Sequence, residues 1–315
     1  MSGAAPYRQT YWDWRAAANF IFGGSGSGLL LLTPLIAYFD GPVRLFLLAG
    51  IGLVGMGLGF VWLEIGKRLR AMNVFRRPNL SWMTRESYAA TAVFVFGLSA
   101  LWRGDFWLVL VTAVFAALFL YCQGYILLAS KGIPAWREKT ALPLIIATGL
   151  VEGLGLVLIA SFLLLGPLNG VVLPLGVGEF FTLSSLPGSL VNGLGLAFAI
   201  GLIVRYLVWR KYFSNFGKSA PEAALKVYDE FGPYFLIGGH ALPFVFTAAA
   251  LPAPSLAAPG FAIAGLFAIA GGWALKFVII TRASYTQGFA IPHRPARGPR
   301  GSGGPGVKPG WKKNT

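Results

Sequence analysis

Two glutamates stand at the ends of a strongly basic segment, and their position indicates proton chemistry at a membrane surface. Residues 64–86, EIGKRLRAMNVFRRPNLSWMTRE, begin with Glu64, end with Glu86 and carry six of the 26 Lys and Arg residues. A long apolar run lies on each side of this segment. An ionisable group at the mouth of a membrane span is costly, so it is retained for a partner or a function. Glu64 and Glu86 are therefore candidate proton-exchanging groups.

Three further polar residues fall near the same ends of neighbouring apolar runs: Asn19, Gln123 and Tyr125. With Arg70 of the basic segment they supply hydrogen-bond donors beside the two carboxyls. A quinone headgroup needs such groups around an apolar slot, because its carbonyl oxygens become hydroxyls on reduction and exchange protons. The residue types thus indicate a quinone site. The alternative interpretation is that both glutamates are solvated anions at the interface, paired with the arginine-rich segment.

A second set of ionisable residues comes one from each of the last four apolar runs: Glu152, Arg205, His240 and Lys276. Glu152 lies roughly 16 Å along a helix axis from the start of its run, at a rise of about 1.5 Å per residue. An ion pair between Glu152 and Arg205 or Lys276 explains how a membrane interior tolerates these charges. A proton path through the four residues is the alternative.

The elements that position these residues follow from composition. The chain has 315 residues, is 56% hydrophobic and only 12% charged, and has a mean hydropathy of +0.67. Soluble domains average about 25% charged residues, so we expect an all-α polytopic membrane protein. Runs of about 20 apolar residues predict eight transmembrane helices, arranged as two four-helix bundles within residues 1–291. The predicted spans are 16–38, 43–63, 88–102, 106–129, 141–165, 189–209, 234–251 and 256–281.

The basic residues test this count of spans. With eight spans, all but two of the 26 Lys and Arg residues fall on one side of the membrane, and the exceptions are Arg44 and Arg103. Loops on the cytoplasmic side carry the excess of Lys and Arg. We therefore expect both termini and segment 64–86 to be cytoplasmic, in a multi-pass protein of a bacterial inner (cytoplasmic) membrane.

Cysteine and histidine counts argue against several cofactors. Cys122 is the only thiol, so the chain alone cannot hold an iron–sulfur cluster, which needs about four thiolates, and it has no zinc-site spacing. A b-type haem between spans needs two facing histidines, but His293 lies beyond the last span and leaves His240 alone. We expect no metal cofactor in this chain. The net charge of +15 lies in loops between spans, so we also expect no nucleic-acid binding.

The segments between and around the spans carry further predictions. Residues 166–188 are apolar enough to lie in the interface or re-enter the bilayer, and residues 219–231 indicate a short surface helix capped by Ser219. The basic tail 292–315 is rich in Gly and Pro, which predicts a flexible segment.

Glycines inside the spans predict close packing of helices. The pairs Gly55/Gly59 and Gly149/Gly153 have the spacing that lets two helix backbones approach. The glycine-rich stretch 23–28 lies inside a span with no strand before it, so we do not expect it to bind phosphate.

Segment 64–86 also carries a recognisable order of residues: an acid, Ile-Gly, a basic Arg-Ala-Met-Asn, and a serine-containing stretch that ends in an acid. In this order it resembles the membrane anchors of molybdopterin oxidoreductases, the DMSO reductase/polysulfide reductase anchor family (DmsC- or NrfD-like). The sequence KGIPAW at 131–136 is similar to that family's IPxxPAW-like segment. The likeness covers the eight spans in number and order. The stretches YWDWRAAANFIFGG and TRASYTQGFAIPHRP resemble the anchor of phenylacetyl-CoA:acceptor oxidoreductase-type complexes.

The resemblance implies an anchor subunit without a redox metal of its own. It implies a quinone, menaquinone or ubiquinone, bound near the face where an iron–sulfur electron-transfer subunit docks, with a molybdopterin catalytic subunit beyond and membrane lipid around. It further implies that Glu86 stands where DMSO reductase anchors have the glutamate of the quinol site, and that Arg70 matches their loop arginine. Glu64 stands where those anchors have a histidine, which is a departure from the pattern.

A secondary transporter is the alternative function. Its support is the ionisable set in the last four spans, which could form the core of a transport path. Inverted-repeat transporters often have interrupted helices at matching positions of their two halves. The spans contain Pro34, Pro143 and Pro243, but these do not form a matched pair.

Overall fold

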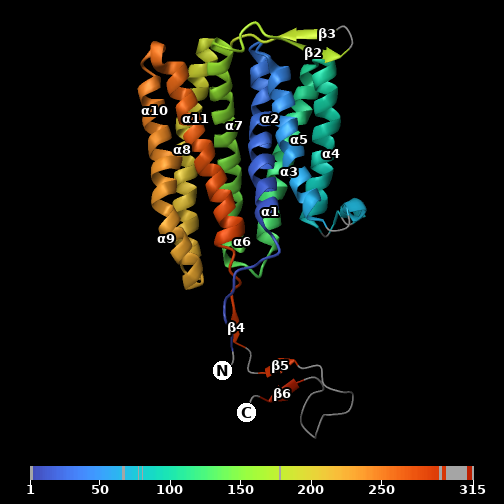
Figure 1. The fold of residues 1–315 in the computed structure, drawn as a ribbon, viewed down its shortest axis with the longest axis vertical. Coiled ribbons are helices and arrows are strands. Elements are labelled where there is room, and N and C mark those ends of the chain that lie inside the picture. Colours follow the sequence, from blue (N-terminus) through green and yellow to red (C-terminus); the bar gives the residue numbers. More distant parts are fainter. Residues whose placement is uncertain are drawn as a thin grey trace.

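Long helices standing side by side dominate the computed structural model, and both termini emerge from the same end of the bundle (Figure 1). The structure describes residues 3–65, 68–76, 78–79, 81–176, 179–290, 293–295 and 311–313.

The first half of the bundle packs around α2. Its elements are α1 (Trp14–Ala18), the π-helical turn η1 (Asn19–Gly23), α2 (Gly24–Tyr38), α3 (Val43–Glu64), the 3-10 helix η2 (Arg68–Arg76), α4 (Trp82–Arg103) and α5 (Phe106–Ala129). α1, η1 and α2 form one continuous rod. α2 contacts α3 and α5, and α4 packs along α5.

The second half packs around α7 and α11. Its helical elements are α6 (Pro134–Arg137), α7 (Ala141–Leu165), α8 (Gly188–Phe216), α9 (Glu222–Leu236), the π-helical turn η3 (Ile237–Ala241), α10 (Leu242–Ala250), α11 (Pro254–Phe277) and the π-helical turn η4 (Val278–Arg282). α7 contacts α8 and α11, and α10 contacts α11. The two halves meet where α2 and α5 pack against α7.

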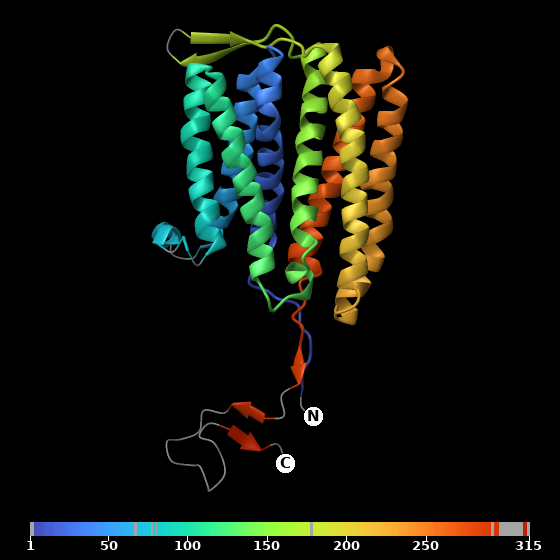
Figure 2. The same ribbon diagram turned by 180° about the vertical axis from the view of Figure 1, so that it is seen from behind.

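The predicted all-α polytopic membrane fold is confirmed. Within the described residues, seven helical stretches are long and apolar enough to cross a membrane, and each overlaps a predicted span. The other predicted span, 88–102, lies inside α4. The first turns of α4 carry Arg85 and Glu86, which lower its hydropathy, yet the helix stands beside α5 like the others (Figure 2).

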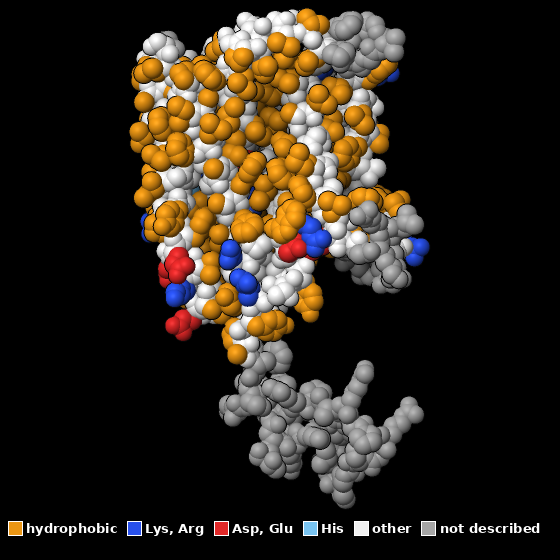
Figure 3. Space-filling model, in the orientation of Figure 1, with side chains coloured by type: hydrophobic (Ala, Val, Ile, Leu, Met, Phe, Trp, Pro, Cys, Tyr) orange, Lys and Arg blue, Asp and Glu red, His pale blue; other side chains and the backbone are white. Residues whose placement is uncertain are grey.

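The outer surface fits a lipid environment. Figure 3 shows hydrophobic side chains over the flank of the bundle, whereas most of the charged side chains visible on this face lie toward the end from which the termini emerge, and a few basic ones lie at the opposite end. Arg44, in the first turn of α3, and Arg103, at the end of α4, lie at the opposite end. The structure therefore separates these two arginines from the termini, as the eight-span order requires.

One connecting segment differs from prediction. The predicted surface helix 219–231 and the span 234–251 form one rod, Glu222–Ala250. Ala224 and Tyr228 are buried in the same core as α8 residues, which keeps the helix in the bundle. Ser219 does not cap it, because Pro221 takes the cap position and makes no side-chain cap bond.

The apolar segment 166–188 contains a β-hairpin that the sequence analysis missed. Strands β2 (Val172–Gly176) and β3 (Glu179–Thr182) pair antiparallel and lie across the end of the bundle opposite the termini (Figure 1). Leu183 and Leu186, just after the hairpin, are buried against the helices. The described part of this segment thus covers the bundle end and does not re-enter it.

The two ends of the chain meet in short strands. β1 (Gly3–Ala4) pairs with β4 (Phe289–Ala290), and β5 (His293–Pro295) pairs with β6 (Trp311–Lys313). The rest of the predicted flexible tail, 292–315, lies outside the described residues.

Glycines bring α2 and α7 together backbone to backbone. A Cβ on Gly28 would collide with the carbonyl of Gly149, and a Cβ on Gly153 would collide with the carbonyl of Gly28. Close packing at Gly149/Gly153 is therefore a feature of the fold. At the other predicted pair, Gly59 faces open space and Gly55 meets only the ring of Phe94 at 3.4 Å, so the prediction is wrong there for this bundle.

We predict that Gly28→Ala lowers the free energy of unfolding by about 3 kcal/mol, because the added methyl group forces two helix backbones apart. Denaturant unfolding in detergent micelles, followed by circular dichroism, measures the change. Gly59→Ala is the matched control and should change stability by less than about 0.5 kcal/mol. Equal losses in the two variants would contradict the α2–α7 contact.

Candidate functional site

A mostly apolar cavity opens where η1, the end of α3 and the start of α4 come together. Its volume is about 280 Å³, near the lower limit of small-molecule sites, which is about 300 Å³. Hydrophobic walls come from Phe20, Leu58, Phe75 and Ile126, among others. The segment η2, which lies beside the lower ends of α3 and α4 in Figure 2, contributes Phe75. The cavity thus lies at the end of the bundle that carries the termini.

Asn19 and Glu86 place polar atoms in this apolar wall. Asn19 Nδ2 donates a hydrogen bond to Glu86 Oε1 at 3.2 Å, and both side chains are buried. Gln123 Nε2 donates to the backbone carbonyl of Asn19 at 3.0 Å and holds η1 in place. Asn19 Oδ1 has no hydrogen-bond partner among the described residues. This oxygen lies beside Gly57 of α3, and an unpaired buried acceptor is costly unless a donor reaches it.

The other predicted members of this site are placed differently. Glu64, at the end of α3, lines the same cavity and is half-buried. Tyr125 does not line it, because its ring stacks on Trp82 with the centroids 4.2 Å apart. The side chain of Arg70 lies outside the described residues. The structure therefore brings together Asn19, Glu64 and Glu86, with Gln123 behind them.

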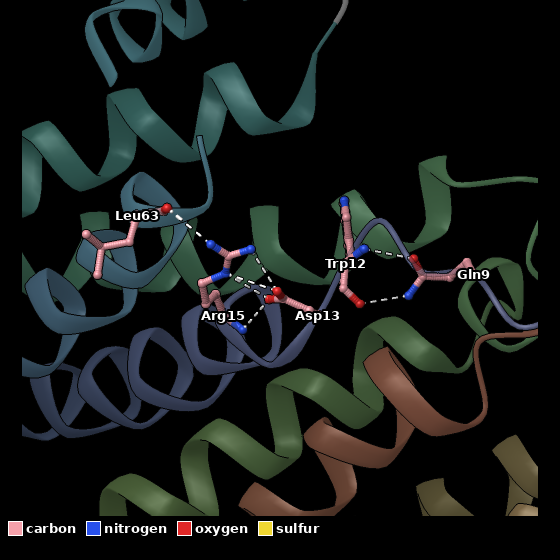
Figure 4. A network of polar contacts seen from close by, with 5 residues as sticks. All are labelled: Gln9, Trp12, Asp13, Arg15 and Leu63. Atoms are coloured by element: carbon pink, nitrogen blue, oxygen red, sulfur yellow. Dashed lines mark hydrogen bonds and ion pairs between the residues drawn. The ribbon is translucent and has the colours of Figure 1, made fainter. Parts of the chain in front are cut away.

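A polar network fixes the chain segment at the mouth of the cavity (Figure 4). Asp13 caps α1 and forms an ion pair with Arg15 at 2.8 Å, and Arg15 Nη1 donates to the carbonyl of Leu63 at 3.2 Å. Gln9 bonds both backbone groups of Trp12, whose side chain lines the cavity. The hydrogen bond from Arg15 lowers the pKa of Asp13 below its usual value of 3.8. These contacts tie the start of α1 to the end of α3.

The second predicted set divides into two buried pairs. Lys276 Nζ lies 2.6 Å from Glu152 Oε2, and neither side chain has any exposed surface. Ser25 Oγ donates to the same oxygen at 2.7 Å, and Trp273 Nε1 donates to Ser25 Oγ at 2.9 Å. This network joins α2, α7 and α11 at the interface between the two halves.

Arg205 pairs with His240 instead of a carboxylate. Arg205 Nε donates to His240 Nε2 at 3.2 Å, and its other nitrogens donate to the carbonyls of Gly239 and Ala268. His240 Nδ1 lies 3.1 Å from the carbonyl of Phe235, and these partners assign the proton to Nδ1. A second, open hollow of about 380 Å³ between α8 and the α9–α10 rod has His240 and Tyr206 in an otherwise apolar wall.

The π-helical turns provide backbone carbonyls that accept hydrogen bonds from buried side chains. A π turn widens the helix and releases a carbonyl from its usual partner, and such turns are frequent at functional sites. In each of the three π turns a buried side chain takes up a carbonyl: Gln123 at Asn19, Arg205 at Gly239, and Trp136 at Ile279. The candidate residues Asn19 and His240 themselves lie in η1 and η3.

Two comparisons with known proteins found no match to this chain. A scan of the chain against protein-family models finds no match. A search of curated proteins finds no similar sequence either. The function must therefore be argued from the residues.

Several site residues escaped the sequence analysis. Ser25 and Trp273 belong to the Glu152–Lys276 network, and Trp12 and Phe75 line the cavity. The sequence could have indicated Ser25, because it is a polar residue within the glycine-rich stretch 23–28 of an apolar span. Within the described residues, no group of three or more His, Cys, Asp or Glu side chains is arranged to hold a metal ion.

We predict that Asp13→Ala lowers the free energy of unfolding by about 1 kcal/mol at neutral pH, because it removes a helix cap. Since the folded-state pKa of Asp13 is below 3.8, the difference from wild type should persist from neutral pH to about 4 and disappear as the pH falls further. Thermal unfolding across this pH range tests it. Asp229→Ala, exposed on α9, is the control and should show no such loss.

Proposed function

We propose that this chain is the quinone-reactive membrane anchor of an oxidoreductase complex, and that the quinone binds in the cavity of Asn19, Glu64 and Glu86. The observation that carries this proposal is a buried carboxyl paired with an amide in an apolar cavity at one end of the bundle. The likeness of segment 64–86 to DMSO reductase anchors supports it independently of the geometry.

The polar atoms of the cavity suit the reduced form of the ligand. Asn19 Oδ1 is an unpaired acceptor among the described residues, and Glu86 offers a carboxyl oxygen beside it. A quinol carries hydroxyl groups that donate to such acceptors, whereas a quinone carries only carbonyl acceptors. The apolar walls suit the ring and the start of an isoprenoid tail. These residues thus fit a quinol of either the menaquinone or the ubiquinone class.

The chain's own residues would handle protons while the electrons pass to a partner. Oxidation of a quinol releases two electrons and two protons, and Glu86 is placed to accept a proton from a hydroxyl group. Glu64 lines the same cavity and is half-buried, so it would be the group that passes the proton on to the solvent at the bundle end. Asn19 orients the ligand by its amide. The reverse sequence reduces a quinone.

The proposed partners follow from the need for an electron carrier. We propose that an iron–sulfur electron-transfer subunit docks at the end of the bundle that carries the cavity and the termini, with a molybdopterin catalytic subunit beyond it. The excess of Lys and Arg at this end supports a cytoplasmic location in a bacterial inner membrane.

We predict that Glu86→Gln weakens binding of a quinol analogue by at least about tenfold, because a charge-assisted hydrogen bond is lost while the shape of the side chain is kept. Quenching of the analogue's fluorescence on membranes that contain the whole complex measures the affinity. Glu230→Gln, exposed on α9, removes the same charge elsewhere and should bind like wild type. Normal binding by Glu86→Gln, with the complex assembled, would overturn the site.

The fully buried Glu152–Lys276 pair favours a second candidate, a secondary transporter whose ionisable core lies in α7, α8, η3 and α11. Purification in a mild detergent separates the two functions. We predict that a tagged chain brings down a protein with the visible absorption of iron–sulfur clusters. A chain that purifies alone and exchanges a labelled solute across vesicles would support the transporter instead.

A further inference from the structure

Two hydrogen-bond acceptors, Glu152 and Gln123, lie near the Lys276 ammonium group, and its ion pair uses the first of them. Its Nζ donates to Glu152 Oε2 at 2.6 Å, and the side chain is completely buried. An ammonium group has three hydrogens to donate. Capacity therefore remains for another acceptor in the same buried space.

Gln123 offers that acceptor at Gly24. A Cβ on Gly24 would collide with Lys276 Nζ and would lie 3.5 Å from Gln123 Oε1, so both groups occupy the space left by the missing side chain. Gln123 Oε1 has no hydrogen-bond partner in the described part of the chain. Both atoms therefore lie around the same glycine, and donation from the flexible lysine side chain to this oxygen is the contact that our proposal requires.

Gln123 acts on Glu86 in two ways. Its side-chain amide interacts directly with the Glu86 carboxyl. Its Nε2 also donates to the backbone carbonyl of Asn19 at 3.0 Å and so positions the residue whose Nδ2 donates to Glu86 Oε1 at 3.2 Å. A Lys276 ammonium group on Gln123 Oε1 would polarise the Gln123 amide and make its N–H a stronger donor, which favours the anionic form of the carboxyl.

We propose that Lys276 is a positioning residue that serves both Glu152 and Gln123, and thereby couples the buried ion pair between α7 and α11 to the proton affinity of Glu86. When Glu152 is neutralised, Lys276 is free to donate to Gln123 Oε1, and the ionised form of Glu86 is then stabilised more strongly. The value of this coupling for catalysis rests on the proposed quinone cavity, but the coupling itself is a property of the chain alone.

Other titratable groups near Glu86 and the ion pair are accounted for. Glu64 lines the same cavity as Glu86, and Cys122 on α5 interacts electrostatically with Glu86. Arg205 acts electrostatically on both Glu152 and Lys276, but its own hydrogen bonds go to His240 and to backbone carbonyls. Gln123 lies beside Lys276 at Gly24 and bonds the Asn19 carbonyl at the cavity, so it is the residue placed to link the two.

The test measures the protonation of Glu86 directly. The full chain is placed in lipid nanodiscs without quinone, and the Glu86 carboxyl band is followed by infrared difference spectroscopy against pH, assigned by its loss in Glu86→Gln. The double variant Glu152→Gln/Lys276→Met removes both buried charges together, so that neither is left unpaired. We expect the pH midpoint of Glu86 to rise by about half a unit or more, roughly threefold in proton affinity.

A double-mutant cycle shows whether the effect passes through Gln123. Gln123→Met should raise the midpoint by itself, and adding Glu152→Gln/Lys276→Met to it should cause no further change. Thr112→Val on α5, which removes a buried hydroxyl that donates to the Leu108 carbonyl of its own helix, is the control and should leave the midpoint unchanged. An unchanged midpoint in Gln123→Met, or equal shifts from the double variant in both backgrounds, would overturn the coupling.

The outcomes also separate this inference from the proposed function. If the midpoints shift as expected while the wild-type complex binds no quinol analogue, the coupling stands and the quinone site fails. If the analogue binds but the midpoints stay fixed, the quinone site stands and the coupling fails. Should the double variant not fold, Glu152→Gln decides: it releases Lys276 to Gln123 and should lower the Glu86 midpoint, and this shift should vanish in the Gln123→Met background. An unchanged midpoint in Glu152→Gln would overturn the coupling.

Discussion

The close contact between α2 and α7 positions the buried polar network between the two halves of this bundle. Because Gly28, Gly149 and Gly153 carry no side chains, the two helix backbones touch. This contact lets Ser25 reach Glu152 and gives Gln123 and Lys276 room at Gly23 and Gly24. Larger residues on either helix would separate the two halves of the bundle and leave the buried ion pair between them without its partners.

A membrane interior requires every polar group to find a partner within the protein. The chain meets this requirement by widening helices at η1, η3 and η4, where released carbonyls accept hydrogen bonds from buried side chains. Five buried side-chain atoms of the described residues lack a hydrogen-bond partner: Asn19 Oδ1, Gln123 Oε1, Glu152 Oε1, Ser27 Oγ and Trp209 Nε1. The first three lie at the cavity or beside the ion pair behind it, whereas Ser27 and Trp209 do not line the cavity.

Local composition predicted most of the fold. Two predicted spans, 106–129 and 141–165, have the same bounds as α5 and α7. In a chain of this composition, an apolar run of about 20 residues indicates a transmembrane helix. The hairpin in 166–188 and the long α9–α10 rod were missed, since their structure depends on what they pack against. In the site, residue types indicated Asn19, Glu64 and Glu86, but the contact between Asn19 and Glu86 joins residues 67 positions apart. Tyr125 has a hydroxyl group that could bind a ligand, but its ring stacks on Trp82 and does not line the cavity.

Photoaffinity labelling tests most directly whether a quinone occupies the cavity of Asn19, Glu64 and Glu86, as we propose. A light-activated quinol analogue is cross-linked to the complex in native membranes, and the labelled peptides are identified by mass spectrometry. The account predicts labels within 58–65 and 72–87, which line the cavity, and their loss when unlabelled analogue is in excess. Competed labelling of 202–206 and 236–244, around the hollow beside His240, would contradict it.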